Sequence, residues 1–271
     1  MPNESWQLTG AGPDSYELYQ VPSVFGPLAE IFLRYVALQK GQRVLDVACG
    51  TGIVARQASQ VLGPSGSIVG VDLSAKMLEV AGINSPTDGA PIDWREGDAT
   101  DLPCLDGEFD VVLCQQGLQF IPDKCRALAE MYRVLKPSGL VGLCVWRGIE
   151  NSPCHSAISA ALKRYASQEI AKRFEAPFGF GDFDLLNSAL SSAGFQSIDI
   201  QIVEVKRRLL PAAESIPGLI ASTPVGPQVA SLPKRTRSTI VEEVASALAV
   251  YREGDGFRIP QSTHIATATR A

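Results

Sequence analysis

The sequence has little of what several classes of protein require. It holds only two histidines, and its six cysteines form no C-x-x-C pair and no Cys/His cluster with zinc spacing. Its longest apolar stretches, such as 140–146, fall far short of the roughly 20 residues of a membrane helix. The polar, acidic start carries no basic segment followed by an apolar one, so no targeting segment is expected. We therefore expect neither a metal site nor a membrane span.

Positive charge is also in short supply, because 24 Lys and Arg face 29 Asp and Glu, a net charge of −5. A protein that coats nucleic acid needs a basic face to displace counterions, so no nucleic-acid partner is expected. The basic clusters at 206–208 and 234–237 are predicted to be solvated ends of secondary-structure elements. Most cysteines lie within apolar runs and are predicted to be buried free thiols, which suits a reducing cytoplasm.

What is present is the composition of an ordinary globular protein, with 271 residues of which 45% are apolar. That is enough to bury a sizeable core. In the first half, short apolar runs alternate with segments of helical periodicity, which is typical of a parallel sheet with helices on both faces. Strands are expected at 43–48, 67–72, 92–97, 109–114 and 140–145, and helices at 23–38, 53–62, 74–81 and 124–135.

The pattern changes after residue 146. We expect a helix at 151–171, a Phe- and Gly-rich loop at 174–183, a helix at 183–193, a strand at 197–205, two helices within 211–254 and a strand at 262–268. The prediction is an α/β, Rossmann-like fold with a seven-stranded, mostly parallel sheet, helices on both faces and a helical cover. It is a single domain over 1–271, with a core of about 36–147, 182–208 and 257–271 and a cover of about 1–30, 150–181 and 209–255.

A glycine-rich turn separates the first expected strand from the next helix, in the run Val44-Leu45-Asp46-Val47-Ala48-Cys49-Gly50-Thr51-Gly52. Glycines let a ligand approach the backbone closely, and free N–H groups at a helix N-terminus attract a negative group. Asp72 lies 20 residues past Gly52, at the tip of the second expected strand, where a carboxylate can accept hydrogen bonds from ribose hydroxyls. By themselves these residues fit a dinucleotide fingerprint as well.

Two further carboxylates separate the possible ligands. Asp46 lies four residues before Gly50 and would repel a pyrophosphate, whereas it favours a zwitterion that carries an ammonium and a sulfonium. Asp98 follows the third expected strand and can accept a hydrogen bond from an adenine amino group. Asp72 and Asp98 can also be helix N-caps without a ligand. The set indicates a charged amino-acid nucleoside rather than a dinucleotide.

Four motifs follow one another in the first half of the chain: Leu45–Gly52 (LDVACGTG), Gly70–Ser74 (GVDLS), Gly97–Ala99 (GDA) and Leu135–Gly139 (LKPSG). In this order they resemble the class I S-adenosylmethionine-dependent methyltransferases, and among these the small-molecule type related to ubiquinone/menaquinone C-methyltransferases. The resemblance is strong over about 40–147. It is weak over the N-terminal helix and the last two strands.

The resemblance implies S-adenosylmethionine as the cofactor and a role for each motif. The loop from Asp46 to Gly52 would hold the methionine part, Asp72 would bind the ribose, and Leu73 would pack on the adenine. Asp98 would bind the adenine amino group, and the backbone of Ala99 would lie beside the ring.

Two more contacts with the cofactor are implied by the same resemblance. Gln115, just after the fourth expected strand, would face the methionine end. Tyr16 begins the run Tyr16–Tyr19, which together with Val21-Pro22 resembles a segment of related members that folds over the cofactor. Tyr16 and Tyr19 can also be a simple helix-packing pair.

A sulfonium methyl group is already activated, so the reaction needs positioning first, and a base only where the acceptor must lose a proton. His155, at the start of the helix after the fifth strand, is the candidate general base, and a surface or capping histidine is the alternative. Gln116 and Gln119 can orient an acceptor, or be solvated loop residues.

The sequence thus predicts a cytoplasmic S-adenosylmethionine-dependent methyltransferase that acts on oxygen or carbon of a small, partly apolar metabolite. The helical cover would select this acceptor. An NAD-dependent oxidoreductase shares the glycine loop and Asp72, but leaves Asp46 and Asp98 without a role. A non-catalytic S-adenosylmethionine-binding protein is the second alternative.

Overall fold

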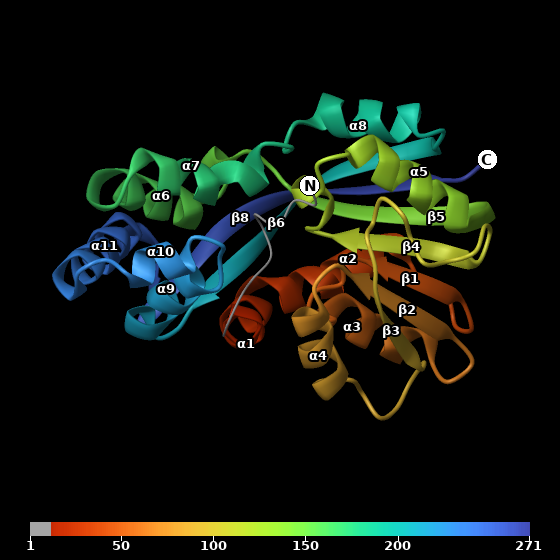
Figure 1. The fold of residues 1–271 in the computed structure, drawn as a ribbon, viewed down its shortest axis with the longest axis horizontal. Coiled ribbons are helices and arrows are strands. Elements are labelled where there is room, and N and C mark those ends of the chain that lie inside the picture. The colour runs from red at the N-terminus through yellow and green to blue at the C-terminus, as the bar shows by residue number, and fades with distance from the viewer. Residues whose placement is uncertain (1–11) are drawn as a thin grey trace. The chain divides into compact units, whose positions relative to one another are not determined.

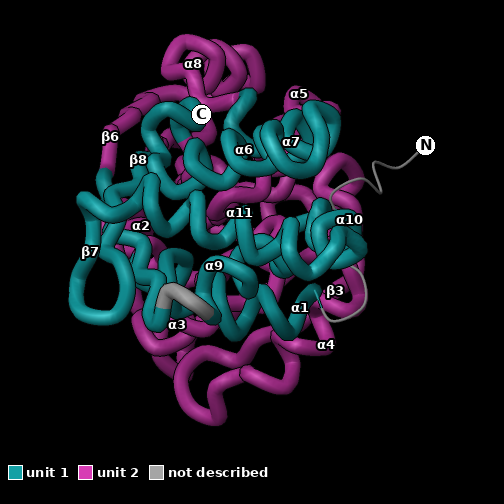
Figure 2. Tube along the Cα trace, turned by 90° about the vertical axis from the view of Figure 1, so that its left-hand side faces the viewer, with its two compact units in different colours: residues 1–27, 147–179, 204–262 teal, residues 28–146, 180–203, 263–271 magenta. Residues whose placement is uncertain are grey.

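The computed structural model describes residues 12–271, so the beginning of the predicted cover, residues 1–11, lies outside the described residues. The chain divides into two compact units (Figure 2). Unit 1 holds the described residues up to 27 together with 147–179 and 204–262, and unit 2 holds 28–146, 180–203 and 263–271. Strands β6 (Gln196–Leu209) and β8 (Gly256–Thr269) contribute residues to both units. The predicted limits of core and cover remain a prediction.

The sheet has the strand order β3-β2-β1-β4-β5-β8-β6, and the short β7 (Arg252–Glu253) pairs with β8. The parallel strands are β1 (Arg43–Val47), β2 (Ser67–Asp72), β3 (Ile92–Glu96), β4 (Phe109–Gln115) and β5 (Leu135–Trp146). β8 runs antiparallel to β5. The predicted α/β fold with a mostly parallel sheet is confirmed, and β7 adds a two-residue strand to the seven expected.

Helices cover both faces of the sheet in unit 2 (Figure 1). One face carries α5 (Lys124–Val134) and α8 (Phe183–Ser192), and the other carries α2 (Gly26–Val36), α3 (Ile53–Leu62) and α4 (Ala75–Ile83). Leu45, Leu128 and Leu190 belong to one buried apolar cluster that joins β1, α5 and α8. α2 packs closely on β5, because a Cβ at Gly142 would lie 2.7 Å from Cγ2 of Val36. The sheet and α2 are therefore in close contact at Gly142.

Short polar side chains begin several of these helices. Ser74 is the N-cap of α4, because its Oγ accepts a hydrogen bond from the Met77 N–H (3.4 Å), and Asp182 is the N-cap of α8, because its Oδ1 accepts one from the Leu185 N–H (3.0 Å). Most of the six cysteines are buried free thiols, as predicted.

Unit 1 is mainly helical. Its helices are α1 (Gly12–Ser15), the π-helical η2 (Tyr16–Phe25), α6 (Pro153–Tyr165), α7 (Gln168–Glu175), α9 (Ala212–Ala221), α10 (Gly226–Ala230) and α11 (Lys234–Ala247), with short 3₁₀ turns at Ile149–Asn151, Ala176–Phe178 and Ala249–Tyr251. A further 3₁₀ turn, Leu118–Phe120, belongs to unit 2. Ile158, Leu162 and Ile240 lie in the buried apolar cluster of unit 1. Over residues 12–271, no helix has the length and apolar character needed to cross a membrane.

The second half differs from the sequence prediction in three places. The expected helix 151–171 is two helices, because Oγ of Ser167 accepts from the Ile170 N–H (3.1 Å) and starts α7 afresh. The two helices expected within 211–254 are three, because Pro227 opens α10 and Pro233 is the N-cap of α11. Residues 136–139, between the expected helix at 124–135 and the expected strand at 140–145, lie inside β5, where its register with β4 is irregular.

Candidate functional site

The loop between β1 and α3 has a backbone that only small residues tolerate easily. Gly50 has φ +57° and Gly52 has φ +83°. A Cβ at Gly52 would lie 2.4 Å from Cη2 of Trp94, so the indole ring supports the loop from one side. A Cβ at Gly50 would meet no atom within 4 Å. The loop is therefore packed at Gly52 and open at Gly50, where a ligand can approach the backbone.

Asp72, at the end of β2, ties this loop to the neighbouring strand. Its Oδ2 accepts a hydrogen bond from the Gly50 N–H (2.8 Å), and its Oδ1 accepts one from the Ser74 N–H (2.9 Å). The Gly97 N–H donates to the backbone carbonyl of Asp72 (3.1 Å), which brings the end of β3 alongside. Burial raises the pKa of Asp72, and the backbone hydrogen bonds oppose that rise. Each oxygen keeps lone pairs for a ligand hydroxyl.

Asp46, on β1, is buried with 1% of its surface exposed. Its Oδ2 accepts a hydrogen bond from the Ala55 N–H in the first turn of α3 (3.1 Å). Gly52 is the N-cap of α3 and has no side chain with which to cap it, so Asp46 does part of that work from the strand. Burial, with the negative charge of Asp72, raises the pKa of Asp46 to about 8 despite the Ala55 hydrogen bond. The sequence did not predict this capping contact.

The remaining predicted cofactor residues of unit 2 lie at the same edge of the sheet. Leu73 is 40% exposed, which is unusual for a leucine beside a buried strand. Asp98 is exposed, and its Oδ1 accepts from both the N–H and the hydroxyl of Thr100 (2.8 Å each). Ala99 is half-buried, and half-buried Gln115 ends β4. The structure thus links Asp46, Gly50 and Asp72 directly and places the others at neighbouring strand ends.

Gln116 and Gln119 are buried rather than solvated. Gln116 Nε2 donates to Oγ1 of Thr263 (3.0 Å) and to Sγ of Cys144 (3.3 Å). Gln119 Nε2 donates to Oε1 of Gln116 (2.8 Å). Gln116 also has φ +55°, a conformation that no sequence pattern here signals. The two side chains therefore form a fixed polar network behind the end of β4.

Tyr16 and His155 belong to unit 1. The Tyr16 ring stacks on Phe25, with centroids 5.1 Å apart. His155 is buried, with its ring centroid 5.6 Å from that of Phe174 and 4.9 Å from that of Phe178. Burial and the positive charge of Arg207 lower the pKa of His155 well below 6.5. The imidazole is therefore neutral at physiological pH, and the alternative of a surface histidine is wrong.

The prediction that residues 206–208 are a solvated basic cluster is wrong for its middle member. Along β6 side chains alternate between the two sides of the strand, so Lys206 and Arg208 are exposed while Arg207 is buried. Arg207 has 1% of its surface exposed. The sequence shows three charges in a row but not which one points inward.

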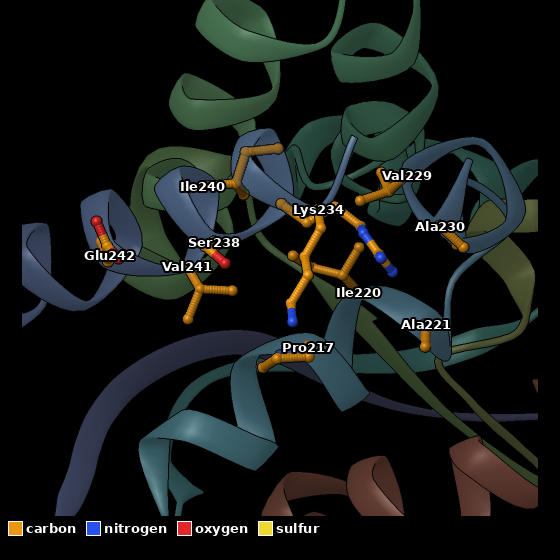
Figure 3. Close-up of a pocket in the computed structure, with 12 residues that line it drawn as sticks. Pro217, Ile220, Ala221, Val229, Ala230, Lys234, Ser238, Ile240, Val241 and Glu242 are labelled. Carbon is orange, nitrogen blue, oxygen red and sulfur yellow. The ribbon is translucent and has the colours of Figure 1, made fainter. Parts of the chain in front are cut away.

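Unit 1 also holds a pocket of about 550 Å³ between α9, α10 and α11 (Figure 3). Ile220, Val229 and Ile240 form part of its apolar wall, and Lys234 extends over it. Among the described residues, none of the buried polar atoms that lack a hydrogen-bond partner belongs to its lining. The pocket thus offers apolar surface with no polar group in need of a ligand.

A parallel sheet with a glycine loop after β1, an acid at the tip of β2 and an open backbone between them defines a class of α/β protein that binds nucleoside ligands at the carboxyl edge. A family model described as a methyltransferase domain matches residues 45–143. The chain is 33% identical over 180 residues to the demethylmenaquinone methyltransferase of Staphylococcus carnosus, covering 62% of this chain and 74% of that protein. The chain therefore belongs to the class I S-adenosylmethionine-dependent methyltransferase family, and this membership makes S-adenosylmethionine its cofactor.

Other known proteins agree with this assignment. The chloroplastic 2-phytyl-1,4-beta-naphthoquinone methyltransferase of Arabidopsis thaliana is 42% identical over 109 residues, which are 39% of this chain and 42% of that protein. Phosphoethanolamine N-methyltransferase 2 of Haemonchus contortus, solved in complex with S-adenosyl-L-methionine, has a TM-score of 0.59 and 21% identity. That match covers 97% of this chain and 58% of the solved one, and it shows a shared fold.

The residues present at the loop fit this cofactor. Gly50 leaves open the space that a side chain would fill, and the first turn of α3 offers N–H groups to a carboxylate. Buried Asp46 and half-buried Asp72 suit a ligand that brings positive charge and hydroxyl groups. A pyrophosphate is itself negatively charged and would oppose the ionisation of both carboxyls instead.

Proposed function

We propose that the carboxyl edge of the sheet in unit 2 holds S-adenosylmethionine for methyl transfer to a small, partly apolar metabolite. The proposed cofactor contacts are Tyr16, Asp46, Gly50, Gly52, Asp72, Leu73, Asp98, Ala99 and Gln115, and the proposed general base is His155. The observation that carries this proposal is the hydrogen bond from the Gly50 N–H to half-buried Asp72, which holds the loop open at Gly50.

Each group at this edge has a separate task. S-adenosylmethionine supplies a methyl group on a sulfonium, activated for in-line displacement. The Asp72 carboxylate orients ribose hydroxyls. Asp46 holds its proton at pH 7 in the ligand-free protein, and the positive charge of the ammonium and sulfonium favours its ionised form. Leu73 gives an apolar surface for the adenine, and Asp98 accepts from its amino group. His155, neutral at physiological pH, accepts a proton where the acceptor must release one.

We propose transfer to oxygen or carbon of the acceptor. The curated relatives are named for demethylmenaquinone and a naphthoquinone, which favours carbon of an aromatic, quinone-type ring. The family model covers residues 45–143, and we assign selection of the acceptor to the helical residues outside it. Buried free thiols support a cytoplasmic location, and the net charge of −5 supports the absence of a nucleic-acid partner.

Calorimetric titration of the full chain with S-adenosylhomocysteine and with NADH tests the cofactor site. We expect S-adenosylhomocysteine to bind and NADH not to bind. Asp72→Ala should weaken S-adenosylhomocysteine binding by about 1.5–3 kcal/mol, which is the contribution of hydrogen bonds to a charged group. Asp93→Ala is the control, because Asp93 is an exposed acid on β3 that pairs with Arg95 (2.7 Å). Tight NADH binding alone would reverse the proposal, and unchanged affinity in Asp72→Ala would remove the ribose role.

A further inference from the structure

Arg207 is one of the largest fully buried side chains among the described residues. Its Nε donates to Oε1 of Gln261 on β8 (2.8 Å), and its Nη1 donates to Oε1 of Gln20 (2.9 Å) and Oγ of Ser23 (3.2 Å), both in η2. All four residues belong to unit 1 (Figure 2). Every one of these partners is electrically neutral, so the guanidinium charge stays unbalanced.

No carboxylate of the described residues compensates that charge. The groups that raise the pKa of Arg207 are Cys154 and Tyr16, and burial lowers this pKa to about 10. Elsewhere in the chain, a partly buried arginine is treated differently, because Arg133 pairs with Glu130 (2.7 Å) and Asp106 (2.6 Å). A buried cation without a counter-ion is costly, and proteins ordinarily avoid it or pair it. An anionic ligand would supply the missing charge.

The guanidinium of Arg207 and the side chain of Gln261 each have a hydrogen-bond donor without a partner among the described residues. Nη2 of Arg207 makes no hydrogen bond to a described residue. Gln261 has 1% of its surface exposed, and because its Oε1 is held by Arg207, its Nε2 is fixed next to the guanidinium, buried and without a partner. The guanidinium and the carboxamide bonded to it thus each keep a donor without an acceptor.

The neutral ring of His155, packed against two phenylalanines, lies close enough to Arg207 to interact with its charge. Arg207 acts electrostatically on His155, whose Nδ1 is also buried without a partner. The His155 ring lies against Phe174 and Phe178. A ligand with a charged end and an aromatic or apolar body matches this combination of a cation, free donors and ring faces.

We propose that Arg207 and Gln261 form a binding site in unit 1 for the carboxylate of a small ligand with an apolar body. This ligand is the methyl acceptor, a point that rests on the proposed function. A carboxylate fits because its two oxygens can accept from Nη2 of the planar guanidinium and from Nε2 of the carboxamide together. The acceptor of this protein therefore carries a carboxylic acid group, which a neutral quinone lacks.

Calorimetric titration of the full chain with 2-naphthoate, its neutral counterpart 2-naphthamide and 2-naphthyl phosphate tests the site. We expect 2-naphthoate to bind about tenfold more tightly than the amide. This factor corresponds to the lower end of the range for one hydrogen bond to a charged group. It should also bind more tightly than the phosphate. Arg207→Met should abolish the preference for the acid. Arg164→Met is the control, because Arg164 is an exposed arginine of unit 1 that pairs with Glu243 (2.9 Å).

Gln261→Glu keeps the test valid where Arg207→Met fails to fold. This change places a carboxylate of the same shape against Arg207, so the variant should unfold at the same or a higher temperature than the wild type and lose the preference for 2-naphthoate. Equal or undetectable binding of 2-naphthoate and 2-naphthamide to the wild type overturns the site. So does a preference that survives in folded Gln261→Glu, or tighter binding of the phosphate.

Failure of this site and failure of the proposed function give different results. Binding of S-adenosylhomocysteine that depends on Asp72, with no preference for 2-naphthoate, overturns only the carboxylate site. A preference for 2-naphthoate that depends on Arg207 supports the carboxylate site even where S-adenosylhomocysteine does not bind, and in that case only the proposed function falls.

Discussion

Replacing Asp46 by asparagine should stabilise the ligand-free protein at neutral pH and weaken its binding of the cofactor. Asparagine has the same shape, and its Oδ1 can still accept from the Ala55 N–H that Asp46 holds at 3.1 Å. The change therefore removes the charge and the titration of this side chain but keeps its contact with α3. The variant separates the structural task of Asp46 from its proposed electrostatic one.

The magnitude follows from the raised pKa of Asp46. In the unfolded chain this carboxyl releases its proton near pH 3.8, and in the folded chain near pH 8. The protonated Asp46 carboxyl makes its full contribution to the free energy of unfolding below pH 3.8. This contribution is lost as the pH rises towards 8. At pH 7 the loss is about 4 kcal/mol, at about 1.4 kcal/mol for each pH unit. The buried Nδ2 of asparagine costs about 1–3 kcal/mol, so the variant should gain about 1–3 kcal/mol.

Denaturant unfolding of wild type and Asp46→Asn at pH 4.5 and pH 7 measures this effect. The variant should be the more stable protein at pH 7 and the less stable one at pH 4.5, because the wild type has lost only about 1 kcal/mol at the lower pH. Asp93→Asn, at an exposed acid on β3, should show no such reversal.

Titration completes the experiment. Asp46→Asn should bind S-adenosylmethionine about tenfold more weakly or worse, and S-adenosylhomocysteine with a smaller loss, because only the former carries a sulfonium. A variant that is less stable at both pH values would refute the raised pKa. Equal losses for the two ligands would refute the contact with the sulfonium.

Two further changes test the packing on which the site depends. Gly52→Ala should cost about 2–4 kcal/mol in thermal unfolding, since the new Cβ meets Trp94 at a positive φ. Gly254→Ala, also at positive φ but with no atom within 4 Å, should cost about 1 kcal/mol, and equal costs would show that the Trp94 contact is irrelevant. Glu130→Gln should cost about 2–3 kcal/mol of unfolding free energy at pH 7, because buried Glu130 binds Arg133 and that hydrogen bond lowers the pKa of Glu130. The stability contributed by ionised Glu130 is present above pH 4.5 and is lost as the pH falls. An unchanged cost at pH 3.5 would contradict the lowered pKa of Glu130.

Much of the cofactor edge could be predicted from the sequence. Apolar runs alternating with helical periodicity indicate a parallel sheet, and the carboxyl ends of parallel strands meet at one edge. Asp46, Gly50 and Asp72 stand directly at such ends, so their proximity follows from their places in the chain, and the hydrogen bond from Gly50 to Asp72 agrees with it. Local signals of this kind depend on residues that are close in sequence or repeated at each strand end.

Residues that act through distant partners could not be predicted in this way. Arg207 looked like part of a solvated basic cluster, yet it is buried by Gln20 and Gln261, which lie 187 and 54 positions away in the chain. Likewise, Asp46 caps a helix nine positions further on, across the glycine loop. Which face of a strand turns inward, and which amide meets which charge, depend on the packing of segments far apart in the chain.

The sequence by itself determined which functional residues follow each strand of this protein: a glycine loop after the first strand and acids at successive strand ends. These residues also indicate the family and its cofactor. Only the tertiary structure decided which charges are buried and left unbalanced. The physical reason is that burial changes the free energy of a charge according to all the groups around it, and these come together only when distant segments pack.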